Sequence, residues 1–141
     1  MANLGSLNLV ILVGHLSSDI KFQWMEVRKK GEKKEETQGM ASFNLATNEV
    51  FAGKGKRVQY HRVVAWGKKA EHCDKYLKKG SLIQVTGKLK HRSYQGNDGR
   101  RQWITEVNAD EITFLGKKGD YRDVPKEEEP TPKSEGKRDP F

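Results

Sequence analysis

Short runs in which apolar and polar residues alternate with a period of two fill most of the first 115 positions, and this is the pattern of half-buried β-strands. The strands are expected at residues 7–16, 20–25, 39–49, 59–66, 81–92 and 101–115, the second being a short continuation of the first. Gly14 lies inside the first run, where a glycine marks a bend or the close approach of another backbone. Imperfect alternation in 101–115 indicates a β-bulge.

One segment has a helical period instead. Between residues 68 and 78 the apolar residues are Ala70, Cys73 and Leu77, and Gly80 follows two lysines as a C-terminal stop. The order is three strands, a helix and two strands. It predicts an all-β OB-fold, which is a five-stranded Greek-key barrel, with one helix between strands 3 and 4. We expect Phe43 and Leu45 in its core.

The segments between these elements are polar or rich in glycine. Residues 28–38 are highly charged and are expected to form a hairpin tip or loop, with a solvated helical turn as the alternative. Residues 51–57 are expected to be a loop, and residues 95–99 a turn-rich tip.

The composition of the 141-residue chain changes near residue 116. Residues 1–119 carry a charge balance of +10, whereas residues 120–141 carry −2 and all four prolines. Such a segment has few apolar groups to offset the entropy lost on ordering. We therefore expect one folded domain at 1–116 and a disordered C-terminal tail at 117–141.

The net charge of +8 fits nucleic acid, an anionic membrane or acidic partners. A single cysteine, Cys73, excludes an internal disulfide framework and a multi-thiolate zinc site, and it favours a reducing compartment. The longest apolar run, residues 9–13, is too short to cross a bilayer, and no secretory signal precedes it. These features predict an intracellular, cytoplasmic protein without membrane association.

The strand at 59–66 carries the most informative side chains. Its alternation places Tyr60, Arg62, Val64 and Trp66 on one face and His61 on the other. Rings stack on bases and a guanidinium pairs with phosphate, which is what binding of unpaired nucleic acid without sequence preference requires. The alternative is a core face with one snorkelling arginine.

The strand at 81–92 and its continuation repeat this combination. Lys88, Lys90, Arg92 and Tyr94 share one face there, opposite Ile83 and Val85. Phe51 and Trp103 flank these strands, together with basic residues at positions 54, 56, 57, 100 and 101. Each cation alone could be a solvated surface charge, but the joint pattern predicts a groove that binds phosphates and stacks bases.

No catalytic or metal site is expected from the residues. The four histidines lack metal-ligand spacing, and Gly53-Lys54-Gly55-Lys56 is too short for a phosphate-binding P-loop. Asp110 and Glu111 are adjacent on a strand, so they face opposite ways and do not form an acid–base pair. The sequence therefore predicts a binding protein that is not an enzyme and has no cofactor.

The chain resembles the bacterial single-stranded DNA-binding proteins, the SSB family. The matching motifs are NLVILVGHL (8–16) with Asp19, FNLATNE (43–49), YHRVVAWGK (60–68), AE (70–71), YLKKGS (76–81), VTGKL (85–89), TEV (105–107) and the C-terminal Asp139-Pro140-Phe141. The resemblance implies an OB-fold that assembles as a homotetramer and binds single-stranded DNA during replication, recombination and repair, in association with the bacterial nucleoid.

The resemblance also assigns roles to individual residues. Phe51, Tyr60, Trp66 and Tyr94 match the positions of base-stacking rings, and His61 matches a histidine at the subunit interface. Asp139, Pro140 and Phe141 match a tip that docks on replication and repair proteins. We expect Arg62, Lys68, Lys88, Lys90 and Arg92 to meet phosphates, with Trp103 nearby.

Two segments depart from the family pattern. Residues 26–38 form a longer loop than usual, and the tip follows Lys137 and Arg138 where acidic residues are expected. Two other functions remain open from the residues. An OB-fold RNA-binding accessory factor would use the same groove chemistry, and an OB-fold nuclease would need clustered carboxylates that are not evident.

Overall fold

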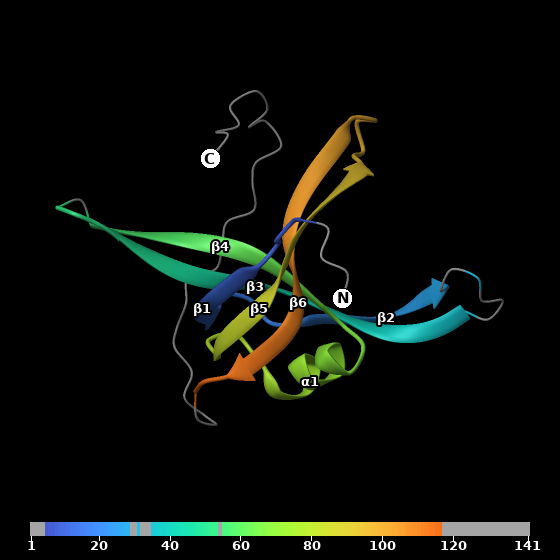
Figure 1. Ribbon diagram of the computed structural model, residues 1–141, viewed down its shortest axis with the longest axis horizontal. Coiled ribbons are helices and arrows are strands. Elements are labelled where there is room, and N and C mark those ends of the chain that lie inside the picture. The colour runs from blue at the N-terminus through green and yellow to red at the C-terminus, as the bar shows by residue number, and fades with distance from the viewer. Residues whose placement is uncertain (1–4, 29–30, 32–34, 54, 117–141) are drawn as a thin grey trace.

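The computed structural model describes residues 5–28, 31, 35–53 and 55–116 (Figure 1). The elements are β1 (Val10–Leu16), β2 (Lys21–Arg28), β3 (Glu35–Phe51), β4 (Gly55–Trp66), α1 (Lys68–Tyr76), β5 (Leu82–Gln95) and β6 (Arg101–Phe114). The predicted tail at 117–141 lies outside the described residues.

The strands form a closed barrel. Their order is β1-β5-β6-β4-β3-β2, and β1 also pairs with β3 at His15 and Leu16. Five strands thus close on themselves, with β4 and β6 parallel and the other pairs antiparallel. The single helix of the described chain lies between β4 and β5, as the OB-fold prediction requires. The extra strand, β2, pairs only with β3.

The core fills the barrel and continues onto α1. Leu16, Leu45 and Ile83 are fully buried, and the helix adds its own Ala70 and Cys73. The predicted core residues Phe43 and Leu45 are confirmed. Figure 1 shows α1 covering one end of the barrel. No helix in the described part of the chain has the length and apolar character needed to cross a membrane.

Two glycines allow strands to approach closely. A Cβ on Gly14 would overlap the carbonyl oxygen of Ala46, where β1 changes partner from β5 to β3, so the predicted close approach is confirmed. A Cβ on Gly87 would overlap the carbonyl oxygen of Asn108. At this point Thr86 pairs with Glu111 and Gly87 with Ala109, which leaves Asp110 as the extra residue of a bulge in β6. The predicted bulge is therefore confirmed.

Two predicted loops are largely strand. β2 and β3 stay paired from Lys21↔Ser42 to Arg28↔Glu35, so residues 35–38 belong to β3, and β2 is a separate strand rather than a continuation of β1. Similarly, β3 and β4 stay paired as far as Phe51↔Gly55, and the turn between them includes Gly53 with φ of 73°. Figure 1 shows these ribbons projecting from the barrel. The outer parts of both ribbons, which include Glu36, Thr37, Asn48 and Glu49, are exposed on both faces, so they lack an apolar period and the pattern missed them.

The single thiol provides a test of the packing of α1. Cys73 is buried, and burial raises the pKa of its thiol to about 11. Only the thiolate reacts with alkylating reagents, and at pH 8 about a thousandth of this thiol is ionised. We expect iodoacetamide to label Cys73 slowly in the native protein and rapidly in denaturant. Fast labelling of the native protein, followed by mass spectrometry, would contradict the packing described here.

Candidate nucleic-acid interface

The outward side of β4 carries the predicted rings and guanidinium. Val63 and Ala65 point into the core, so alternation turns Tyr60, Arg62 and Trp66 outward, where each is half-buried. Neither ring belongs to the core cluster. The alternative of a core face is therefore wrong for these rings, although Val64 between them is buried.

The outward side of β5 carries the second set. Ile83 and Val85 point into the barrel, whereas Lys88, Lys90 and Arg92 alternate with them in direction and are exposed. Tyr94 follows on the same side, with an exposed ring. We call the outward surface of β4, β5 and β6 the cationic face, and its members are Tyr60, Arg62, Trp66, Lys88, Lys90, Arg92, Tyr94 and Glu106.

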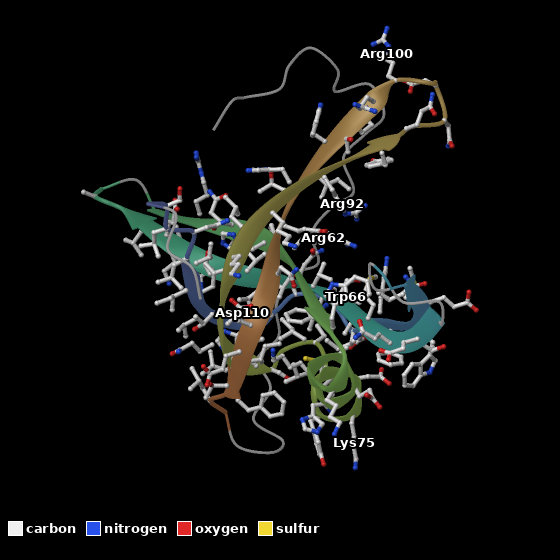
Figure 2. The ribbon with its side chains drawn as sticks, turned by 45° about the vertical axis from the view of Figure 1, so that its right-hand side comes forward. Arg62, Trp66, Lys75, Arg92, Arg100 and Asp110 are labelled. Carbon is white, nitrogen blue, oxygen red and sulfur yellow. The ribbon has the colours of Figure 1, made fainter. Side chains whose placement is uncertain are left out.

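β6 lies between β4 and β5 and joins the two sets through Glu106. Nε of Arg62 donates to one carboxylate oxygen at 3.0 Å, and Nε of Arg92 donates to the other oxygen at 2.9 Å. Figure 2 shows the two arginines side by side, with Trp66 farther along β4. The sequence analysis missed Glu106, because the alternation of one strand does not reveal its cross-strand neighbours.

The other cations that are predicted to meet phosphates are less constrained. Lys88 and Lys90 are exposed, and neither forms an ion pair with another residue that the structure describes. Lys68 is exposed as the first residue of α1, after Gly67 turns the chain with φ of 70°. It therefore lies beside the end of β4 rather than on the sheet.

Of the two predicted aromatic contacts that flank these strands, the structure places only Trp103. The backbone of Phe51 ends β3, but its side chain lies outside what the structure describes. Trp103 pairs with Ser93 and is 61% exposed, whereas Tyr94 pairs with Gln102. Trp103 and Tyr94 therefore point to opposite faces of the β5–β6 ribbon. A strand bound at Tyr94 would meet Trp103 only by passing around this ribbon.

Comparison with known proteins agrees with this geometry. Residues 7–115 match the single-strand binding protein family. The chain belongs to that family. It is 40% identical over 111 residues to a single-stranded DNA-binding protein of Bacillus cereus, which covers 77% of this chain and 60% of the relative.

Other members of the family are similarly related. The single-stranded DNA-binding protein of Halalkalibacterium halodurans is 38% identical over 80% of this chain and 63% of its own length. Single-stranded DNA-binding protein 1 of Chlorobaculum tepidum is 36% identical over 79% of this chain and 67% of its own length. The chain thus spans about three fifths of the length of the Bacillus relatives.

His61 faces away from the cationic face. Its Nε2 lies 2.8 Å from Oγ1 of Thr47, and the side chain is half-buried. Burial lowers the pKa of His61 below its usual 6.5, and the charge of Glu49 opposes this shift. The predicted place of His61 at a subunit interface is not tested by a single chain.

The lowered pKa of His61 predicts a pH-dependent stability. His61 binds a proton more tightly in the unfolded chain than in the folded protein. The contribution of His61 to folding stability is therefore complete above pH 6.5. This contribution is lost as the pH falls from 6.5 toward the pKa that His61 has in the folded protein. Urea unfolding at pH 7.5 and 5.5 should show a smaller loss of stability for His61→Gln than for the wild type. His72→Gln, at an exposed position, is the control, and an equal loss in all three proteins would contradict the assignment.

Further exposed rings lie away from the cationic face. Trp24 is 59% exposed and packs edge-on against Phe22 at 5.2 Å between ring centroids. Trp24 pairs with Gly39 whereas Trp66 pairs with Met40, so the two indoles point to opposite faces of the sheet. Tyr76 on α1 is also exposed, 6.3 Å from the ring of Phe114. The sequence analysis did not single out these rings, and they serve below as internal controls.

Within the part of the chain that the structure describes, no group of three or more His, Cys, Asp or Glu side chains is placed to hold a metal ion. Asp110 and Glu111, which the sequence analysis considered as a pair, lie at the β6 bulge and are both exposed.

Proposed function

We propose that this protein binds single-stranded DNA without sequence preference and protects it during replication, recombination and repair. The observation that carries the proposal is the cationic face, where rings and cations from β4 and β5 meet on one accessible surface. Stacking of a base on an aromatic ring contributes about 1–3 kcal/mol and does not depend on the identity of the base. The protein acts by binding rather than by catalysis.

The contacts follow from the places of the side chains. Tyr60, Trp66 and Tyr94 stack bases, while Arg62, Arg92 and the two lysines of β5 meet phosphates. Lys68 adds a contact beside the end of β4, and the sequence predicts further contacts by Phe51 and Trp103, the latter reached only by a strand that passes around the β5–β6 ribbon. Names of the relatives agree with this function, since each is called a single-stranded DNA-binding protein.

A competition experiment tests the proposal. A fluorescent dT oligonucleotide is titrated with the full chain at low salt, and unlabelled DNA, RNA and duplex DNA are added as competitors. We expect tight binding of the dT strand, effective competition by any single-stranded DNA and weak competition by duplex. Tight preference for RNA would favour the RNA-binding alternative, cleavage of the strand with magnesium or calcium would favour a nuclease, and absence of a complex would refute the proposal.

The assembly is proposed to be a homotetramer. Leu7, Leu9, Ile11 and Val13 form an exposed apolar row on the N-terminal segment and β1. β1 pairs with β3 only at His15 and Leu16, so Val10–Val13 have β5 as their single paired neighbour among the described strands. An apolar row beside an open strand edge fits a second copy of the chain. Light scattering should give four times the 16.1 kDa chain mass, and a monomer at micromolar concentration would contradict the proposal.

We propose that the C-terminal tip, Asp139-Pro140-Phe141, docks on replication and repair proteins. The protein would then act at the bacterial nucleoid in the cytoplasm. The tip lies outside the described residues and after the predicted domain boundary. Deleting these three residues should leave dT affinity unchanged and remove binding to such proteins. A large loss of DNA affinity would show that the tip belongs to the strand-binding surface.

A further inference from the structure

Glu106 is an acidic residue at the centre of a surface proposed to bind a polyanion. It lies on β6, next to Lys90 as its cross-strand partner on β5 and beside Arg62 on β4. Its side chain is 11% exposed, while those of Arg62 and Arg92 are 35% and 48% exposed. The two guanidinium groups therefore cover the carboxylate from solvent.

The bonds to Glu106 fix both arginines while leaving them able to bind. Each arginine uses Nε toward Glu106, so its Nη groups remain available as donors and its planar face remains available for stacking. A guanidinium held by a second hydrogen-bonded group loses less side-chain freedom when it meets a ligand. Glu106 thus orients two contacts that come from strands that are not neighbours.

The trio of Arg62, Glu106 and Arg92 is not the only link between β4, β5 and β6. β5 and β6 are paired along thirteen register positions from Ile83 to Gln95, and β4 pairs with β6 through Val63 and Val64. Backbone pairing on both sides of β6 therefore links these strands independently of the three side chains. The trio is better explained by its effect on the orientation and charge of the cationic face.

The trio also changes the electrostatics of the surface. Two arginines and one carboxylate give a net charge of +1 where the arginines alone would give +2. Salt dependence of binding to single strands follows the number of phosphates neutralised, with a slope near 0.7 for each. The trio therefore neutralises about one phosphate fewer than its two cations suggest.

We propose that Glu106 is a positioning residue of the DNA-binding surface, a role that rests on the proposed function. Glu106 holds Arg62 and Arg92 as oriented contacts and makes DNA binding less sensitive to salt. Removing its charge frees the arginines to neutralise phosphates and loses their orientation. Affinity then rises at low salt and falls at high salt.

The test measures dT affinity of Glu106→Gln and wild type over a range of NaCl concentrations. We expect the slope of log K against log[NaCl] to steepen by about 0.7 in the variant, so that the two lines cross. Glu111→Gln is the matched control, because it makes the same charge change on β6, at an exposed position that has no ion pair within the described structure. We expect its slope to equal that of the wild type.

A double variant tests the bonded arginines at constant net charge and remains informative if the single variant folds poorly. Arg92→Gln with Glu106→Gln keeps the net charge of +1 at this place but removes the bonds to the carboxylate. We expect the wild-type slope with several-fold weaker binding at every salt concentration. A double variant as tight as the wild type, or a single variant with an unchanged slope, would overturn the role of Glu106 although wild-type binding persists. Absence of wild-type binding would instead refute the proposed function itself.

Discussion

Replacing Trp66 with alanine is expected to weaken binding of a dT oligonucleotide by about 1–3 kcal/mol, or roughly 5- to 150-fold. The indole is half-buried at the C-terminal end of β4, on the same outward face as Tyr60 and Arg62. Its loss removes one stacking platform without opening the core, because Trp66 is not part of the core cluster. Anisotropy titrations at fixed salt measure the change.

Two matched variants sharpen this expectation. Trp66→Phe retains a ring and should retain most of the affinity. Trp24→Ala removes an exposed indole from the opposite face of the sheet and should leave the affinity unchanged. If Trp24→Ala weakened binding as much as Trp66→Ala, the strand would follow a different surface from the cationic face.

Gly87→Ala is expected to cost about 3 kcal/mol of folding free energy. The added Cβ would overlap the carbonyl oxygen of Asn108, beside the β6 bulge that lies opposite Gly87. The atom in the way belongs to the backbone, so neither strand can relieve the overlap by a change of rotamer. Urea unfolding followed by circular dichroism measures the loss.

Gly96→Ala is the control for this substitution. Its added Cβ would meet Oδ1 of Asp98 at 3.1 Å, and this side-chain oxygen can shift slightly while it still accepts a hydrogen bond from the N–H of Arg100. We expect a loss well below that of Gly87→Ala. A loss for Gly87→Ala as small as that for Gly96→Ala would show that the bulge does not require glycine and that another feature of the chain fixes the β5–β6 register.

Features with a local cause could be predicted from the sequence. Alternation along a single strand correctly placed Tyr60, Arg62 and Trp66 opposite the buried Val63 and Ala65. The helical spacing of Ala70 and Cys73 likewise predicted the element that closes one end of the barrel. In each case, residues within one element determine which side is buried.

Features that depend on register between strands could not be predicted. The partnership of Arg62, Glu106 and Arg92 requires three strands to be aligned, and no single strand contains that information. The direction of Trp103 depends on the turn that pairs Gln95 with Arg101, since a shift of one residue would reverse it. At the outer end of the β2–β3 ribbon Glu36 and Thr37 point to opposite faces and both are exposed, so this part of the sequence lacks the apolar period by which strands are recognised.

Crosslinking tests the cationic face most directly. A dT oligonucleotide containing 5-iodouracil is bound to the full chain and irradiated, and the crosslinked residues are identified by mass spectrometry. We predict crosslinks to Trp66, Tyr60 or Tyr94, and none to Trp24 and Tyr76, although these two rings are more exposed. Crosslinks confined to Trp24 or Tyr76, with the three rings of the cationic face unmodified, would contradict the account.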